Sequence, residues 1–486
     1  MPAAPFPMYV DGAAHVPDRP AREVRSPGDG TVAGRVLLGT PDDVDRAVTA
    51  ARAAAPAWRH TSVFDRAGLC RRLADAVVAR KDELATLLTA EHGKPFHSEA
   101  RGEVDAVATA FRDAADQVVS LRAESIAVRD PAKRVLIQRR PRGVYSVITP
   151  WNFPIAVAAI YYLAPGIASG NTLVWTPAPS VSGVASLLTG VLHDAGLPSG
   201  VLNLVTGEGP VVGNAAIRHP GVNAVGFTGS TATGHAIAQA GAGKPVQLEL
   251  GGNGPTIVLE DADLDLAAAA IASGSFGNAG QICTSTERVL AHAGVAADLA
   301  ERVAALADKI VLGDPFAAET TMGPVHTAEL ADRVCAQITD AASRGGRVLA
   351  GGGRPDDAPT PHYVRPTVVD DVPPDSDLHV AETFGPVAPI VRWNTPDELR
   401  ALVAASGFGL SGAVFSRDVG RAITLAEDLP CGIVNLNEAS SYWEPNIPAG
   451  GTAGSGSGHG RTGGPWSIEE MTEQQAIVIS TGPWEA

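Results

Sequence analysis

Apolar residues recur at helical spacing in the first part of the chain, with aspartate and arginine between them. A period of about 3.6 residues is typical of amphipathic helices. It predicts helices over residues 42–60, 66–91 and 102–121. Two short runs of β-favouring residues follow at 134–138 and 143–148, flanked by arginine and proline, and predict strands.

Short apolar runs then alternate with helical segments. We expect strands at 172–175, 202–205, 224–227 and 246–250, with helices at 182–195, 211–218 and 233–240 between them. A second alternation begins after the glycine pair at 251–252, includes a strand at 287–291 and a helix at 295–312, and ends in a strand at 476–479. Such β-α-β alternation is typical of doubly wound parallel sheets. We therefore expect an α/β protein with two such sheets.

The composition excludes several classes of protein. With 486 residues, 45% of them hydrophobic, the chain can bury a large core and is not disordered or collagen-like. The 37 basic and 53 acidic residues give a formal net charge of −16, which disfavours nucleic acid or an anionic membrane as a partner. The first residues lack the pattern of a signal peptide and no apolar run reaches bilayer length, so we expect a cytoplasmic protein.

The four cysteines lie far apart, and none has metal-ligand spacing, so we predict neither a metal site nor a disulfide framework. Cys283 follows the small residues of 277–280 and has polar neighbours that could activate a thiolate. The alternative interpretation is an inert core cysteine.

Three further positions carry two interpretations each. Asn152, after a predicted strand, is either a turn former or an amide donor to an oxyanion. Glu249, between two leucines, is either a paired carboxylate or a general base. Residues 227–234 follow a strand and open a helix, where free N–H groups can bind phosphate. A literal GxGxxG at 458–463 follows no strand and is a chance match.

Five motifs in order resemble those of the aldehyde dehydrogenase superfamily. They are TPWNFP at 149–154, FTGSTATG at 227–234, LELGG at 248–252, GQIC at 280–283 and ETFGP at 382–386. The resemblance runs from about residue 8 to residue 479 and implies the fold of that family, with two doubly wound parallel-sheet domains and a β-arm for oligomerisation.

The resemblance also implies a mechanism. Cys283 would attack the aldehyde carbon, the Asn152 amide and the Cys283 N–H would hold the oxyanion, and Glu249 would activate water to hydrolyse a thioester. It implies a cofactor site at Thr149, Pro150, Trp151, Thr176, Pro179, Gly209, Phe227, Thr228, Gly229, Ser230, Leu250, Gly251, Glu382 and Phe384. It implies a substrate pocket at Phe153, Tyr161, Thr284, Tyr442 and Trp443.

Some positions depart from the family pattern. Thr176 stands where relatives carry a lysine that binds the adenosine end of the cofactor, and Pro179 stands where a glutamate favours NAD. We expect NAD or NADP, leaning to NAD. Tyr162 and Pro465 replace a lysine and a glutamate of a proton relay, so protons would leave through water or Tyr162. The chain has only five lysines, Lys81, Lys94, Lys133, Lys244 and Lys309, so these losses are notable.

The loop at 437–445 is expected to line the substrate pocket. Because no lysine or arginine occurs between 430 and 460, an apolar or aryl aldehyde is favoured over succinate semialdehyde. Arg112 stays open as a distant partner for a carboxylate. Tyr442, Trp443 and Glu444 could instead form a cage for a cationic aminoaldehyde, or simply pack the loop.

Two alternative functions are a CoA-acylating dehydrogenase, which Glu249 disfavours, and a non-catalytic binding relative, which intact Cys283, Glu249 and Asn152 disfavour. We predict a dinucleotide-binding domain at 1–120 and 141–250, a catalytic domain at 251–465, and an oligomerisation arm at 121–140 and 466–486. The partners expected are a small aldehyde and further copies of the chain, in a homodimer or homotetramer.

Overall fold

The apolar runs of the first half of the chain assemble into an eight-stranded sheet. A computed structural model describes residues 4–482, and in it the strand order is β19-β11-β10-β7-β8-β9-β1-β2. The five strands from β11 to β9 pair in parallel, and the edge strands are antiparallel. The bounds are β1 Met8–Val10, β2 Ala13–His15, β7 Val144–Thr149, β8 Thr172–Pro177, β9 Leu202–Leu204, β10 Ala224–Thr228, β11 Val246–Glu249 and β19 Gly458–His459.

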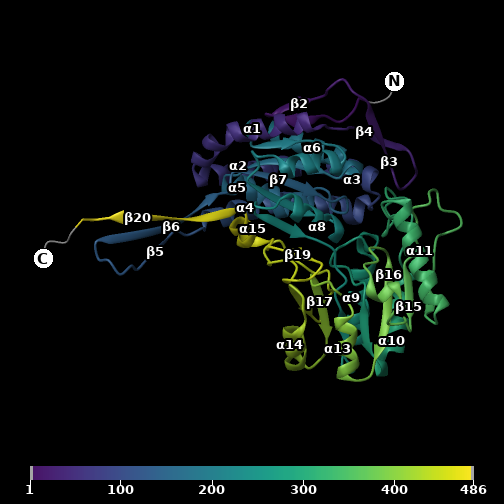
Figure 1. Cartoon of the computed structure of the whole chain (residues 1–486). Coiled ribbons are helices and arrows are strands. Elements are labelled where there is room, and N and C mark those ends of the chain that lie inside the picture. The colour runs from purple at the N-terminus through teal and green to yellow at the C-terminus, as the bar shows by residue number, and fades with distance from the viewer. Residues whose placement is uncertain (1–3, 483–486) are drawn as a thin grey trace.

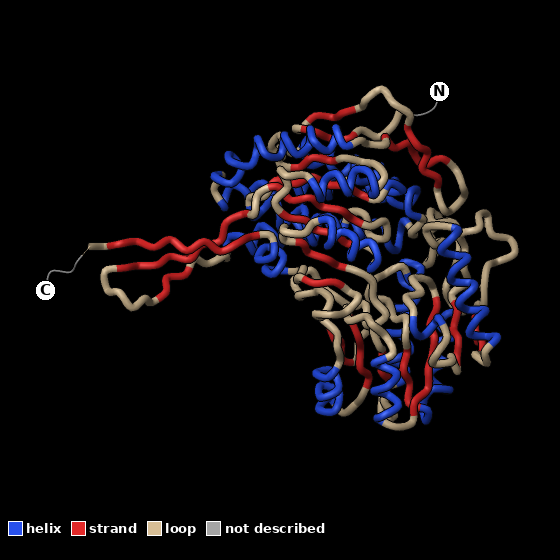
Figure 2. The backbone as a smooth tube through the Cα atoms, viewed as in Figure 1, coloured by secondary structure: helices blue, strands red, loops and turns tan. Residues whose placement is uncertain are grey.

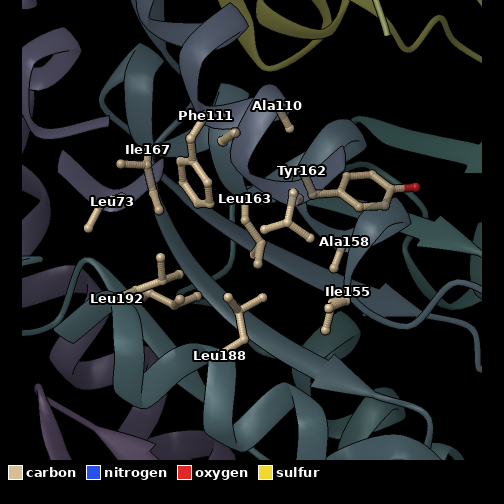
Figure 3. Packing of buried hydrophobic residues seen from close by; sticks show 14 of the residues in the cluster. Leu73, Ala110, Phe111, Ile155, Ala158, Tyr162, Leu163, Ile167, Leu188 and Leu192 are labelled. Carbon is tan, nitrogen blue, oxygen red and sulfur yellow. The ribbon is translucent and has the colours of Figure 1, made fainter. Parts of the chain in front are cut away.

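Side chains of the central strands alternate between two apolar layers, as the pleat of a strand requires. Tyr145 and Trp175 face the layer that contains α2, α4, α5 and α6, whereas Val144 and Val174 face the layer with α1, α7 and α8. Figure 3 shows part of the first layer, with Phe111, Leu163 and Ile167 in contact. The bounds are α1 Pro41–His60, α2 Val63–Ala79, α3 Lys81–His92, α4 Arg101–Val119, α5 Ala164–Ser169, α6 Ser182–Asp194, α7 Asn214–Arg218 and α8 Thr231–Ala240.

The single helix expected over 66–91 is wrong, because the structure has two helices there. Arg80, with φ −111° and ψ 19°, ends α2 and begins α3. Asp82 and Glu83 occupy the first turn of α3, where acidic side chains stabilise a new helix N-terminus. Both helices keep apolar residues at helical spacing, so the periodicity does not reveal the break between them.

The second alternation forms a seven-stranded sheet in the order β14-β15-β16-β13-β12-β17-β18. Its strands pair in parallel except β14, which is antiparallel to β15. Its strands are β12 Thr256–Val258, β13 Val289–His292, β14 Arg347–Ala350, β15 Thr367–Asp370, β16 Val387–Trp393, β17 Ser411–Phe415 and β18 Ile433–Leu436. Its helices are α9 Leu264–Phe276, α10 Ala293–Ala307, α11 Ala328–Ser343, α12 Asp377–Val380, α13 Pro396–Ala404 and α14 Val419–Asp428.

Two expected elements of this region are shifted. The strand predicted at 287–291 begins only at Val289, because Glu287 bonds backbone N–H groups of another loop. The helix predicted at 295–312 ends at Ala307, and Leu312 instead forms a bridge with Met322. Tertiary contacts of single residues therefore end elements that the apolar pattern would continue.

A narrow β-arm projects from the body (Figures 1 and 2). It consists of β5 Glu124–Ile126, β6 Lys133–Pro141 and β20 Thr472–Ser480, paired antiparallel in the order β20-β6-β5. The expected arm began at residue 466, but α15 (Gly464–Glu470) packs on α4 in the body, and Ile468 is buried there. The remaining two strands, β3 Ala21–Arg25 and β4 Val32–Leu37, form a separate hairpin.

Within residues 4–482, no helix has the length and apolarity needed to cross a lipid bilayer.

Candidate active site

A cavity of about 710 Å³ lies at the carboxyl ends of the parallel strands of the first sheet. Strands β7, β10 and β11 end there, and their following residues line it: Asn152 after β7, Gly229 after β10 and Leu250 after β11. The second half of the chain supplies the opposite wall, including Cys283 and Glu382. Ligands of open α/β sheets bind at such strand ends. The topology of the first sheet thus brings three of the five sequence motifs together, and GQIC and ETFGP join them from the second half of the chain.

Cys283 lies on a strained loop that follows α9. Asn278 and Ala279 have φ of 50° and 54°, in the left-handed region that L-residues rarely adopt, and Gly280 follows at 73°. A Cβ on Gly280 would lie 2.0 Å from the carbonyl oxygen of Gly385. The backbone of the cysteine loop thus lies directly on the backbone of the ETFGP loop. Strain of this kind persists at sites where surrounding contacts over-determine the geometry.

The sulfur of Cys283 is in an environment that disfavours its charged form. Burial, and then the carboxylates of Glu249 and Glu382, raise the pKa of Cys283 to about 12. In the cofactor-free protein the group is therefore a thiol at neutral pH, and a nucleophilic attack requires a base to remove its proton.

Glu249 is a second buried ionisable group of the same cavity. It ends β11, is buried, and its Oε1 atom has no hydrogen-bond partner among the described residues. Burial raises the pKa of Glu249 well above the usual value, the nearby Arg461 guanidinium opposes this shift, and Glu470 adds to it. A Cβ on Gly450 would lie 2.9 Å from Arg461 Nη1 and 3.1 Å from Glu249 Oε1, so the two side chains meet at this glycine.

Asn152 presents its amide beside the cysteine loop. Its Nδ2 donates to the carbonyl oxygen of Gln281 at 3.0 Å, which leaves a second N–H of the same amide for another acceptor. The backbone carbonyl of Asn152 accepts hydrogen bonds from Lys94 Nζ at 3.0 Å and from Asn278 Nδ2 at 3.1 Å. Lys94 was not among the residues expected at the site, although the scarcity of lysine in the chain was a signal that could have indicated it.

The ETFGP loop carries Glu382 and Phe384 into the same cavity. Glu382 Oε1 accepts from the Gly252 N–H at 2.9 Å, and the Phe384 ring meets the Trp151 ring edge to face at 5.6 Å between centroids. Buried Glu287, which sequence reasoning did not identify, accepts the N–H groups of Thr383 at 2.8 Å and Phe384 at 2.7 Å. The available signal in the sequence was an acidic residue, Glu287, directly before the strand that begins at Val289.

The cavity wall includes most of the other cofactor residues inferred from the resemblance. They are Pro150, Trp151, Thr228, Gly229, Ser230, Leu250 and Gly251. Ser230 caps α8, so free N–H groups of a helix start face this region.

Five inferred cofactor residues lie away from the cavity lining. Thr149 Oγ1 accepts from Trp175 Nε1 at 2.8 Å, and the ring of Phe227 is in the core. Thr176 is buried with an unpartnered hydroxyl, Pro179 begins the short helix η3 (Pro179–Val181), and Gly209 begins η4 (Gly209–Gly213).

Four of the five inferred substrate residues, Phe153, Tyr161, Thr284 and Trp443, line the cavity. The placement of Tyr442 there is wrong: its side chain is 44% exposed and its hydroxyl donates to Glu444 Oε1 at 2.7 Å. The cage of Tyr442, Trp443 and Glu444 is therefore not formed around the cavity. Arg112, the distant alternative, pairs with Asp75 on the surface at 3.0 Å and does not line the cavity.

Tyr162 belongs to η2 (Ala158–Leu163), a π-helical segment. Figure 3 shows its ring at the edge of the apolar cluster with the hydroxyl pointing away from it. That hydroxyl lies 2.8 Å from Thr228 Oγ1, and burial raises the pKa of Tyr162 well above its usual value. Pro465 lies in α15 and lines a different, open depression at the base of the arm.

Comparisons with known proteins agree with this geometry. The chain matches the model of the aldehyde dehydrogenase family over residues 15–477. It is 35% identical over 497 residues to the chloroplastic betaine aldehyde dehydrogenase of Beta vulgaris, covering 100% of this chain and 98% of that protein.

Two solved structures are similar along their whole length. An NAD-dependent aldehyde dehydrogenase from Sinorhizobium meliloti has a TM-score of 0.94 at 35% identity, covering 100% of this chain and 97% of that one. An NADP-dependent enzyme from E. coli has a TM-score of 0.94 at 33% identity, covering 98% of each chain.

The fold and its relatives define an oxidoreductase that acts on aldehydes. The chain belongs to the aldehyde dehydrogenase family, whose members bind NAD or NADP.

Replacing Gly280 by alanine should disrupt the contact between the cysteine loop and the ETFGP loop. The added Cβ collides with the Gly385 carbonyl and the residue keeps a positive φ. We expect the free energy of unfolding to fall by about 1–3 kcal/mol and aldehyde oxidation to fall at least tenfold. Thermal unfolding and NADH absorbance measure the two effects.

Gly407→Ala is the matched control, because nothing lies within 4 Å of a Cβ at that exposed glycine. Equal stability and activity of the two variants would contradict the proposed close packing.

Alkylation of Cys283 in the cofactor-free protein should depend steeply on pH. With a pKa of about 12, the thiolate fraction, and so the rate with iodoacetamide, should rise about tenfold per pH unit from pH 7 to pH 10. Glu249→Gln removes a carboxylate that raises this pKa and should make alkylation faster at each pH. Peptide mass spectrometry separates Cys283 from the other cysteines. A plateau below pH 8 would show that the thiolate is already formed.

Proposed function

We propose that this protein oxidises an aldehyde to the carboxylic acid through a thioester on Cys283, with NAD or NADP as the acceptor. The observation that carries the proposal is that Cys283, Glu249 and Asn152, which come from three separate segments of the chain, line one cavity together with Glu382 and Phe384. A nucleophile, a base and an oxyanion donor in one apolar cavity are the groups that acyl chemistry requires.

Each residue has one part in the proposed reaction. The Cys283 thiol releases its proton to solvent, and the sulfur bonds to the aldehyde carbon. The second N–H of the Asn152 amide and the Cys283 N–H hold the resulting oxyanion. A bound nicotinamide would supply the acceptor for the hydride that leaves the former aldehyde carbon, which gives the thioester on Cys283. Glu249 then removes a proton from water, the hydroxide bonds to the thioester carbon, and the carbon–sulfur bond breaks to release the acid.

The residues present fit a dinucleotide. The capped N-terminus of α8 offers free N–H groups to phosphate, Glu382 offers a carboxylate to ribose hydroxyls, and the buried Thr176 hydroxyl lacks a partner. We propose NAD as the preferred cofactor, because neither Thr176 nor Pro179 supplies a cation for the additional phosphate of NADP.

We propose an apolar or aryl aldehyde as the substrate. The wall contains Phe153, Ile160, Tyr161 and Trp443, and the rings of Tyr161 and Trp443 meet edge to face at 5.7 Å. Each of the two cations among the described lining residues faces an acidic side chain of the same cavity. Lys94 pairs with Glu103, and Arg333 opposes the rise in pKa that burial causes at Glu382. A second carboxylate of a semialdehyde would therefore compete with Glu103 and Glu382 for these cations.

We further propose that the first sheet with its helices binds the dinucleotide, that the second carries the nucleophile, and that the arm joins copies of the chain. The arm has exposed apolar side chains at Leu136, Ile477 and Val478, the last 64% exposed, which suits coverage by another copy in a dimer or a tetramer.

A crossed panel of aldehydes and cofactors tests the proposal. Benzaldehyde and hexanal should be oxidised with kcat/KM at least tenfold above that of succinate semialdehyde, with betaine aldehyde as the cationic member of the panel, and NAD should be preferred to NADP. The physical reason is that transferring a carboxylate from water into a cavity that Glu249 and Glu382 already line is costly. Absorbance of the reduced cofactor at each combination provides the measurement. The substrate assignment fails if either charged aldehyde is the best.

Substitutions of Cys283 and of Glu249 should impair the reaction at different steps. Cys283→Ala should abolish turnover and retain NAD binding by calorimetry. Glu249→Gln should reduce steady-state turnover by about 10²–10⁴ and leave an acyl-enzyme that mass spectrometry detects as an adduct on Cys283.

The raised pKa of Glu249 should appear as an increase in turnover with pH, through a pKa above the ordinary glutamate range, and this step should be absent in Glu249→Gln. Full turnover by Glu249→Gln would refute the base assignment.

A further inference from the structure

Lys94 occupies a buried position from which it reaches the backbone of the oxyanion donor. It follows α3, and its side chain and that of Glu103, in α4, are each 1% exposed. The Nζ atom lies 2.6 Å from Glu103 Oε2 and donates to the Asn152 carbonyl at 3.0 Å. The ring of Phe153 covers the same ammonium, 4.1 Å from its centroid. The three donors of the ammonium group therefore face three partners.

The partner carboxylate holds the other side of the same loop. Glu103 Oε1 accepts the N–H groups of Ile155 and Ala156, each at 3.1 Å. Lys94 and Glu103 thus bond the chain on both sides of Phe153, directly after the residue that would hold the oxyanion. Charge-assisted hydrogen bonds in a buried environment fix geometry more strongly than neutral ones.

The backbone carbonyl of Asn152 also contacts the loop that carries Cys283. Asn278 Nδ2 donates to the Asn152 carbonyl at 3.1 Å, the Asn152 amide donates to the Gln281 carbonyl at 3.0 Å, and the Asn278 N–H donates to Glu99 Oε1 at 2.8 Å. Residues 94–103 therefore contact both the loop of Asn152 and the loop of Cys283.

We propose that Lys94, together with Glu103, is a positioning residue for the oxyanion site: it fixes the Asn152 main chain so that the side-chain amide stays beside the sulfur of Cys283. This inference rests on the proposed role of Asn152 in the reaction. It assigns Lys94 no contact with substrate. A displacement of the donor by about 1 Å can lower a rate by about 10²-fold, so the effect should fall on formation of the acyl-enzyme.

The test is a double-mutant cycle between Lys94 and Asn152, read by the single-turnover rate of NADH formation with benzaldehyde. Lys94→Met alone leaves the Glu103 carboxylate buried without its cation, which can prevent folding. The variant Lys94→Met/Glu103→Gln removes both charges and keeps the acceptor for Ile155 and Ala156. We expect it to lower the single-turnover rate about 10- to 100-fold, with NAD affinity and the alkylation rate of Cys283 unchanged.

In the background of Asn152→Ala, the same double substitution should lower the rate less than threefold further, because the donor that Lys94 positions is already gone. Lys81→Met is the matched control: Lys81 also joins α3 to α4 through a carboxylate, that of Asp105, but on the surface, and its rate should stay within twofold.

Three results would overturn the positioning role: a rate within threefold of the wild type, an undiminished further loss in the Asn152→Ala background, or an equal loss of NAD affinity. A normal rate in Asn152→Ala itself would instead refute the proposed oxyanion donor, so the two failures are distinguishable.

Discussion

Direct packing of backbone on backbone around Cys283 is the constraint on which the site depends. A Cβ on Gly252 would lie 2.0 Å from the Cys283 carbonyl oxygen, and a Cβ on Gly280 would lie 2.0 Å from that of Gly385. No side chain fits at either contact. The strand that ends in Glu249, the loop of Cys283 and the loop of Glu382 can therefore approach until their functional groups share one cavity. Since these segments belong to two different sheets, the same contacts also join the two halves of the molecule.

The close approach of these three segments determines the pKa values of the ionisable groups in the cavity. Glu249, Glu382 and Glu287 are brought together in an environment with little water, and burial raises the pKa of each. Burial, and then Glu249 and Glu382, also raise the pKa of the Cys283 thiol. A buried carboxylate of raised basicity is suited to removing a proton from the water that hydrolyses a thioester. Arg461 opposes this rise in pKa at Glu249, and Arg333 opposes it at Glu287 and Glu382. Both guanidinium groups donate to backbone carbonyls.

The parts of the structure that were predicted correctly share a cause. Strand–helix alternation predicted the α/β class because parallel strands buried on both faces are continuous apolar runs, as β8 shows. The site residues Cys283, Glu249 and Asn152 were identified from ordered motifs, and the structure places all three in the cavity. The errors have other causes. The break at Arg80 depends on a local helix start within a continuous pattern, and the outward orientation of Tyr442 depends on its bond to Glu444.

The sequence by itself determined which residues are chemically special and in what order they follow, because a short motif such as LELGG or GQIC contains both the reactive side chain and the glycine that allows close approach. It also determined the fold class, because periodicity is a local property of the chain. Only the tertiary structure decided which distant residues support the reactive ones. Lys94 and Glu103 precede Asn152 by some fifty residues, and Glu287 and Glu382 are nearly a hundred apart. No local pattern encodes such pairs, because each is formed only when packing brings the partners together and removes them from water.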